Sequence, residues 1–220
     1  MEVRAPESHN CFRMSNMAER RGTAALLLLM CMPLVAASRL SSLQVPGPAK
    51  IHIRLADLAV LPDKLRSQSE ATVRALYRKA GLEIDFVNCP PAPDYTCSQA
   101  PGPGDLWVQI QNKRPKLLHG DTTGFAILVP TGRLSDSYAV VSFPMVEAAA
   151  RELDAPVADV LAASLAHEIG HLLLHSPVHT RSGMMSPRLD RRQMLLLERG
   201  ELGFTPEETA RLATTGVGPL

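Results

Sequence analysis

The chain has 220 residues, enough for one domain of ordinary size with a well-formed core. Its charge is almost balanced, with 23 Lys plus Arg against 22 Asp plus Glu, so it has neither the basic surplus of a nucleic-acid-binding protein nor an acidic tail. We therefore expect no nucleic-acid partner. The 18 prolines and 14 glycines indicate many turns and long loops.

The N-terminal residues have the pattern of a secretory signal peptide. A short basic region after Met17 precedes an apolar run over residues 24–37 and a group of small residues ending at Ser38. This predicts export to the periplasm or the medium, with cleavage near residues 37–38. A membrane anchor is the alternative, but a span needs about 20 apolar residues and this run is shorter. We expect no stable span after cleavage; Met1 and Met17 are both candidate starts.

Three parts of the chain follow from this pattern. Residues 1–38 are the extension and signal peptide, residues 39–50 form a linker, and residues 51–220 form a single domain. Cys89 and Cys97 lie in the domain, close in sequence, and in an exported chain such a pair predicts a disulfide across the Pro-rich loop between them. Two free thiols are the alternative, and a metal site is disfavoured because the spacing is wider than CxxC.

Alternating apolar residues predict five strands, over residues 51–60, 82–89, 105–111, 124–130 and 137–143. Between the first two, residues 62–81 have apolar side chains at helical spacing, and Gly81 is a natural helix end. The loop from Cys89 to Gly104 is dense in Pro and Gly, and the turns DTTG and PTGRLSD bracket the fourth and fifth strands. The N-terminal part of the domain is therefore predicted as strand, helix and four further strands.

The hydrophobic period changes to that of a helix after the fifth strand. Residues 154–176 form a largely buried helix in this prediction, with Asp154 as N-cap, Pro156 in the first turn and Pro177 just past the end. An irregular stretch follows.

A last helix is expected to begin at Thr205, which lies in capping-box register with Glu208 and precedes Pro206. The whole order of elements is that of an α+β domain.

The stretch HEIGHLLLHSPVH, residues 167–179, contains four of the seven histidines. His167 and His171 are four residues apart, so on a helix their imidazoles lie one turn apart on one face and can bind one ion. Glu168 lies one residue further round, where it can reach a water at the ion without binding the ion. HExxH therefore predicts a zinc site with Glu168 as general base. A chance occurrence is disfavoured because unpaired His and Glu side chains are costly to bury on an apolar helix.

A third ligand is needed, because a catalytic zinc ordinarily takes three protein ligands and keeps one position open. His175 continues the spacing, but it lies roughly 12 Å along the helix axis from His167, at 1.5 Å per residue. His179 follows Pro177, where the chain must leave the helix, so a turn can bring it back to the ion. We therefore predict His179 as the third ligand and His175 as a polar cap at the helix end.

Two alternatives stay open for that third ligand. His175 could bind if the helix ended early. In a gluzincin-type site, a downstream helix within RRQMLLLERGE would instead present Glu198 or Glu201 to the metal.

The stretch HEIGHLLLHSPVHTRSGMMSP resembles the metzincin clan of zinc endopeptidases, and especially short exported bacterial members with a longer gap before the third histidine. The clan's pattern is HExxH, a glycine, a third histidine and a methionine turn beneath the metal. The resemblance implies one catalytic Zn²⁺ with three histidine ligands and a glutamate base, namely His167, His171, His179 and Glu168. Met184 or Met185 would be the turn methionine, and the similarity of GMMSP to the ALMYP of matrix metalloproteases favours Met185.

The order of elements also resembles the clan's upper subdomain. The resemblance implies a zincin-like mixed five-stranded sheet with a backing helix, an active-site helix and a small irregular C-terminal subdomain that ends in a helix. The fourth strand would be an edge strand that pairs with an extended peptide, through Ala126, Ile127 and Leu128.

The sequence departs from the clan's pattern in three respects. Seven residues separate His171 from His179, where HExxHxxGxxH has five. Leu174 stands at the position of the glycine, so the turn must be built differently. No tyrosine follows the methionine pair, so nothing supports a tyrosine that assists the oxyanion.

These observations favour an exported zinc endopeptidase that acts on peptide or protein substrates; they indicate no oligomeric state. A non-catalytic zinc-binding module is the first alternative, and the intact Glu168 argues against it. A zinc hydrolase of a non-peptide amide is the second, and a substrate screen would separate it from a peptidase.

Overall fold

The computed structural model describes residues 49–89, 97, 102, 105–130 and 136–215. The predicted signal peptide and cleavage site lie outside the described residues. So do residues 39–48 of the predicted linker, whose last two residues, 49 and 50, belong instead to the first strand.

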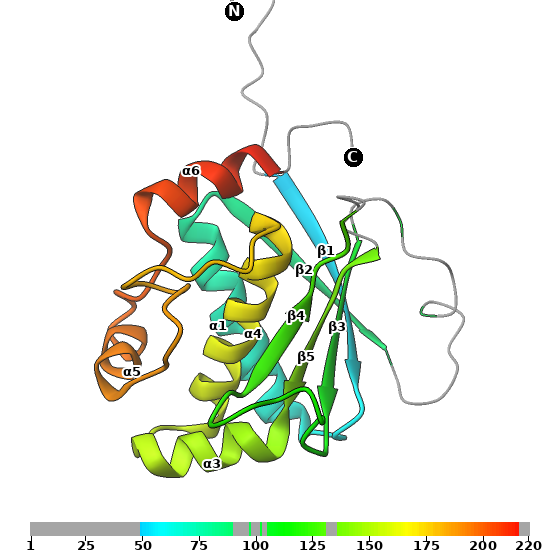
Figure 1. Ribbon diagram of the computed structural model, residues 1–220, viewed down its shortest axis with the longest axis vertical. Coiled ribbons are helices and arrows are strands. Elements are labelled where there is room, and N and C mark those ends of the chain that lie inside the picture. The colour runs from blue at the N-terminus through cyan, green and yellow to red at the C-terminus, as the bar shows by residue number, and fades with distance from the viewer. Residues whose placement is uncertain (1–48, 90–96, 98–101, 103–104, 131–135, 216–220) are drawn as a thin grey trace, which may run out of the picture. The chain divides into compact units, whose positions relative to one another are not determined.

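The strands form one five-stranded sheet in the order β2-β1-β3-β5-β4 (Figure 1). Their bounds are β1 Ala49–Asp57, β2 Leu82–Cys89, β3 Asp105–Gln111, β4 Gly124–Ile127 and β5 Tyr138–Ser142. The pairs β1–β2, β1–β3 and β3–β5 are parallel, whereas β4 runs antiparallel to β5. The expected mixed five-stranded sheet is therefore confirmed, with β2 and β4 as its two edge strands.

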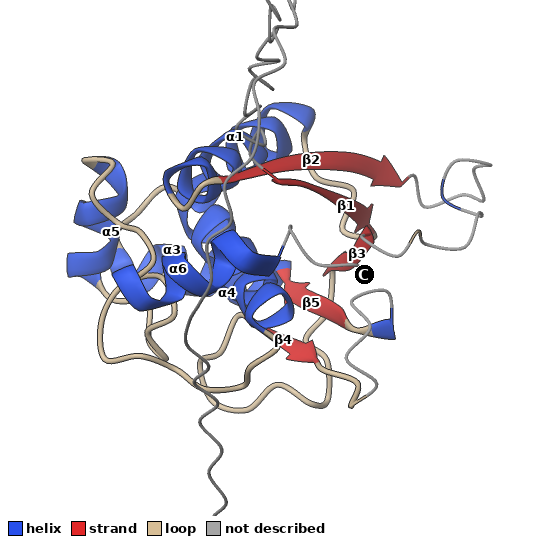
Figure 2. Cartoon of the chain, turned by 90° about the horizontal axis from the view of Figure 1, so that it is seen from above, coloured by secondary structure: helices blue, strands red, loops and turns tan. Residues whose placement is uncertain are grey.

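Alternation along the strands separates a covered face from an open face. On β1, Ile51, Ile53 and Leu55 are buried, while the alternate residues His52 and Arg54 are only partly buried. Helices α1 (Asp63–Lys79) and α4 (Val157–Leu174) pack against the covered face, as the view from above shows (Figure 2). Burial of these β-branched and leucine side chains between helix and sheet is the main stabilising contribution of the domain.

Helix α4 is the central element of the core. It contacts β3, β4 and β5 as well as α1, α3, α5 and α6. The helix is long and apolar enough to cross a membrane by composition, but 78% of it is buried inside the domain. Its hydrophobicity is thus that of a core helix surrounded by protein on most sides.

One helix was missed by the sequence analysis, and one cap was assigned to the wrong helix. Residues after β5 form α3 (Phe143–Leu153), with Pro144 in its first turn. Asp154 is the C-cap of α3, with a left-handed backbone at φ 51°, and the N-cap of α4 is Pro156. The prediction of Asp154 as N-cap was wrong because a second helix ends there, and Asp is among the residues that tolerate the left-handed region.

The described residues after α4, 175–215, are largely irregular and contain two further helices. These are α5 (Arg191–Glu198) and α6 (Pro206–Thr215). The predicted capping box of α6 is present: the amide of Glu208 donates to Thr205 Oγ1 over 3.2 Å, and the Thr205 amide donates to Glu208 Oε2 over 2.8 Å. The start of α6 was therefore predictable from local sequence alone.

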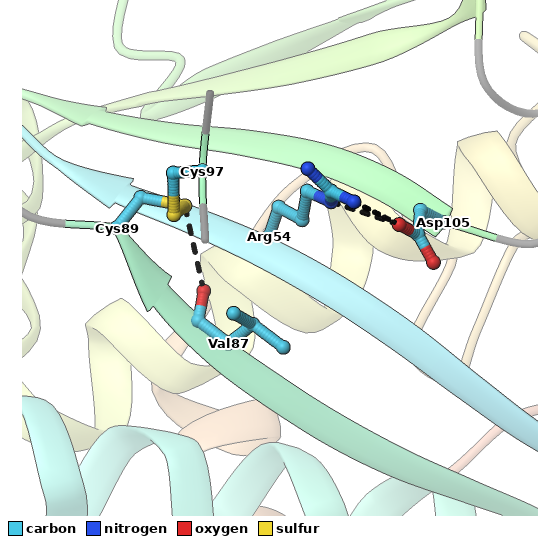
Figure 3. The surroundings of a disulfide bond; sticks show 5 residues. All are labelled: Arg54, Val87, Cys89, Cys97 and Asp105. Atoms are coloured by element: carbon cyan, nitrogen blue, oxygen red, sulfur yellow. Dashed lines mark hydrogen bonds and ion pairs between the residues drawn. A yellow bond between two sulfur atoms is a disulfide. The ribbon is translucent and has the colours of Figure 1, made fainter. Parts of the chain in front are cut away.

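The predicted disulfide is present between Cys89, the last residue of β2, and Cys97, with a Cα–Cα distance of 5.6 Å (Figure 3). Beside it on the open face, Arg54 of β1 forms an ion pair of 2.8 Å with Asp105, the first residue of β3. The disulfide ties the end of β2 to Cys97, and the ion pair ties β1 to the start of β3.

Candidate metal centre

Three histidines converge at the C-terminal end of α4. The Nε2 atom of His171 lies 3.1 Å from Nε2 of His167 and 3.2 Å from Nε2 of His179. One ligand atom from each of the three residues lies within 4.8 Å of the other two. Among the described residues this group is able to hold a metal ion, and an all-histidine donor set is one that zinc accepts in catalytic sites.

The opposite ring nitrogens of two of these histidines bind backbone carbonyls. His167 Nδ1 lies 2.9 Å from the Met184 carbonyl oxygen, and His171 Nδ1 lies 2.7 Å from that of Ser176. A carbonyl can only accept, so each Nδ1 carries the proton and each Nε2 keeps its lone pair for a metal. These hydrogen bonds also fix the orientation of the two rings.

Burial keeps the same two rings neutral. The pKa of His167 is lowered to about 4, first by burial and also by the adjacent His171 and His179, against the opposing effect of the hydrogen bond to Met184. The pKa of His171 is also lowered, first by burial. Because a metal competes with protons for the imidazole lone pair, neutral rings favour metal binding.

The chain returns to the site through an unusual helix end. Leu174 ends α4, and His175, the C-cap, has a left-handed backbone with φ 44° and ψ 49°. The amide of Ser176 then donates to the carbonyl of His171 over 3.2 Å. A left-handed residue is what glycine ordinarily supplies at this point, so His175 replaces the missing glycine one position later. His175 is therefore the polar cap that the sequence predicted.

A tight turn lies beneath the histidines. Gly183 has φ +83°, and the amide of Ser186 donates to its carbonyl over 3.2 Å. Met185 is fully buried, and its sulfur packs so closely on Gly170 of HEIGH that any added Cβ there would overlap it. Met184 contributes its backbone carbonyl to His167. Met185 thus supports the helix from below while Met184 orients a histidine.

Glu168 is 5% exposed and lies next to the histidines on α4. Burial raises the pKa of its carboxyl to about 8. Gly124, the first residue of β4, leaves room for this side chain: a Cβ there would lie 2.9 Å from Glu168 Oε1 and 2.8 Å from the carbonyl oxygen of Val140. The Glu168 carboxyl therefore fills the space that a side chain at Gly124 would need.

Hydrogen bonds hold the start of β4 against α4. Thr123 Oγ1 lies 2.8 Å from Ser164 Oγ, and Ser164 is one helical turn before Glu168. The amide of Ser142, in β5, donates to the carbonyl of Thr123 over 2.8 Å. These bonds set the spacing at which Gly124 meets Glu168.

The histidines and Glu168 line a cleft of about 1160 Å³. One wall is β4 and the residues before and after it, including Ala126 and Leu128, with Leu128 just past the end of the strand. The turn after α4 and residues 186–190 also line the cleft. So do Ala149, Glu152 and Leu153 of α3, which the sequence did not indicate because α3 itself was not predicted. An extended polymer could lie along β4 and reach the histidines.

The structure does not bring the alternative ligands into the site. His175 lines the cleft but is outside the group of three converging histidines. Glu198 lies near Asp159, which is in the first turn of α4. The pKa of Asp159 is raised by burial and by the charge of Glu198. Neither Glu198 nor Glu201 lines the cleft.

Two glycines at the site, Gly124 and Gly170, were not among the residues that the sequence predicted for it. Gly170 carries a signal in sequence, since a glycine inside an apolar helix indicates close packing. Gly124 carries none, because its role depends on Glu168, which is far away in the sequence on α4.

Three converging imidazoles and a buried carboxyl in an open cleft define a candidate metal centre of the kind found in zinc hydrolases. No family model matches the sequence, and no curated protein does either.

Among solved structures, the archaemetzincin of Methanopyrus kandleri is similar over 78% of this chain and 98% of its own, with a TM-score of 0.51 and 19% identity. Metalloproteinase-II of Bacteroides fragilis has a TM-score of 0.49 at 12% identity, over 78% of this chain and 55% of that one. A zinc-dependent peptidase of Methanocorpusculum labreanum has a TM-score of 0.49 at 15% identity, over 73% and 99%. At 19% identity, the likeness to the archaemetzincin shows that the two chains share a fold.

Proposed function

We propose that this protein is an exported zinc-dependent peptidase of the metzincin type. The observation that carries the proposal is the convergence of His167, His171 and His179 beside the buried carboxyl of Glu168, at the foot of an edge strand. A zinc-binding module without catalytic function has no need of that carboxyl. The disulfide between Cys89 and Cys97 supports export, because such bonds persist in oxidising compartments.

The three histidines fit zinc in number, type and protonation. They would supply its three protein ligands through Nε2, with Nδ1 of two of them engaged by backbone carbonyls. When bound, zinc supplies Lewis-acid chemistry, which lowers the pKa of water and polarises a carbonyl oxygen.

Glu168 would accept the proton of the attacking water and later pass it to the leaving amine. Its pKa of about 8 in the metal-free protein reflects burial alone, and a nearby cation would lower it into the range of a base. The adjoining edge strand β4 would bind the substrate as an added strand through backbone hydrogen bonds. The cleft walls would exclude part of the water around the reacting bond.

Glu168→Gln is expected to retain zinc and lose peptidase activity. Loss of a general base typically lowers the rate about 10²–10⁴-fold, whereas the ligands are untouched. Cleavage of casein and zinc content by elemental analysis are measured on the same purified sample. A variant that cleaves casein as fast as wild type contradicts the mechanism. Wild-type protein that binds zinc but cleaves no protein, while hydrolysing a small amide, identifies a different hydrolase.

A further inference from the structure

The segment that carries the third histidine has no regular structure of its own. Residues 175–190 contain no helix or strand, and His179 itself is exposed. The spacer between His171 and His179, residues 172–178, is also longer than in HExxHxxGxxH. The chain therefore loses more conformational entropy when this segment is fixed in one conformation. Something outside the segment must hold His179 in place for a metal to bind tightly.

The first restraint comes from helix α6. Thr180, the residue after His179, has its Oγ1 2.9 Å from Glu208 Oε1, and it also lies 2.9 Å from the carbonyl oxygen of Ser182. Glu208 is 4% exposed, and its other carboxylate oxygen accepts from the Thr205 amide. The amide of Thr180 meanwhile donates to the carbonyl of Met185 over 2.9 Å. Thr180 is thus tied both to the turn beneath the site and to α6.

The second restraint is at the end of α4. The last carbonyls of a helix have no partner within it, and two of those in α4 are satisfied by side chains of α6. Arg211 donates to the carbonyl of Leu174 over 2.7 Å, and Thr215 donates to that of Leu173 over 3.3 Å. Both acceptors lie just before His175, where the chain leaves the helix. Helix α6 therefore holds the spacer at both of its ends.

We infer that α6 is a positioning element for the metal centre: Glu208 and Arg211 hold the spacer so that His179 meets His167 and His171. This inference rests on the proposed zinc site and adds to it the residues that keep the third ligand in register. The residues concerned do not touch the metal, so they act through His179. Removing a partner of this kind lowers metal affinity by roughly 10–100-fold.

Thr180→Val tests the inference, because it removes the hydroxyl that reaches Glu208 and keeps the shape of the side chain. The zinc dissociation constant, measured by competition with a chelating dye, is expected to rise roughly tenfold, the lower end of the range for such partners. Thr180→Ser keeps the hydroxyl and should restore wild-type affinity. Arg211→Met should also weaken zinc binding, and it decides the matter if Thr180→Val does not fold.

Thr205→Ala is the matched control, because it destabilises α6 without removing the contact between α6 and Thr180. It removes the hydroxyl at the start of α6, yet both hydrogen bonds of the Glu208 carboxylate remain possible. It should lower the melting temperature of the metal-free protein and leave zinc affinity unchanged. Thr214→Val, whose hydroxyl bonds only within α6, should change neither.

The outcomes separate this inference from the proposed function. If His167→Ala abolishes zinc binding but Thr180→Val and Arg211→Met bind zinc like wild type, the role of α6 is refuted and the metal site stands. If zinc affinity simply follows melting temperature across the variants of Thr180, Thr205, Arg211 and Thr214, the role of α6 is structural and the inference is wrong. If His167→Ala binds zinc as tightly as wild type, the metal site itself is wrong.

Discussion

Two histidines four residues apart, His175 and His179, have different positions relative to the metal centre. His175 is the left-handed C-cap of α4 and lies outside the converging group, whereas Nε2 of His179 is 3.2 Å from that of His171. His179→Ala should therefore lower zinc occupancy sharply. His175→Ala should leave zinc bound and activity within roughly tenfold, the lower range for residues outside the ligand set. Elemental analysis of both variants measures this, and the reverse pattern would mean that the ligand assignment is wrong.

Gly124 is a second residue whose identity depends on its neighbour. A methyl group there would press on the Glu168 carboxyl and on the Val140 carbonyl. Gly124→Ala is expected to displace the base and lower kcat by roughly tenfold or more, since small misplacements of catalytic groups are costly. Zinc content should not change, because no ligand is touched. Steady-state kinetics with zinc analysis check this, and an unchanged kcat would show that the close contact is without consequence.

At the scale of elements, β4 is the one strand among the described residues that borders the cleft, and within that part of the chain it pairs on one side only, with β5. If substrate adds to its free edge, affinity depends on the substrate backbone. Methylating one amide of a peptide substrate near the scissile bond should then raise KM roughly threefold to tenfold, the effect of losing one hydrogen bond. Peptides of identical sequence, with and without the methyl group, are compared. Equal KM values at every methylated position would exclude strand addition.

At the scale of the whole molecule, the buried site should make the stability of the metal-free protein depend on pH. The folded-state pKa of Glu168 is raised from 4.5 to about 8. Its stabilising contribution to the free energy of unfolding is therefore fully present below pH 4.5 and lost as pH rises to 8. The pKa of His167 is lowered from 6.5 to about 4, so its contribution is present above 6.5 and lost as pH falls to 4.

Through Glu168, the metal-free protein should therefore lose stability as pH rises from 4.5 to about 8. Glu168→Gln, in the presence of a chelator, should be more stable than wild type at pH 8, and this advantage should shrink towards pH 5. Urea unfolding at both pH values measures the difference. An advantage that is equal at the two pH values would place the origin of the effect elsewhere.

Local sequence determined the elements whose signals are contained within a few residues. The alternation of Ile51, Ile53 and Leu55 predicts β1, and the capping box of Thr205 and Glu208 predicts the start of α6; both are present. The pairing of His167 with His171 follows from helix geometry alone, because residues four apart share a face. The disulfide of Cys89 and Cys97 was predictable for a similar reason, since the two are close in sequence.

Only the tertiary structure decided the features that depend on contacts between segments far apart in the chain. The boundary at Asp154 was misjudged because a left-handed Asp ending one helix resembles an Asp capping the next. The order of the strands and the contact of Gly124 with Glu168 exist only once β4 lies against α4. The sequence by itself determined which histidines share a helix face, since that needs only the helical repeat. Only the folded chain decided what holds the third one there, because the partners of its segment come from α6 and from the turn at Gly183.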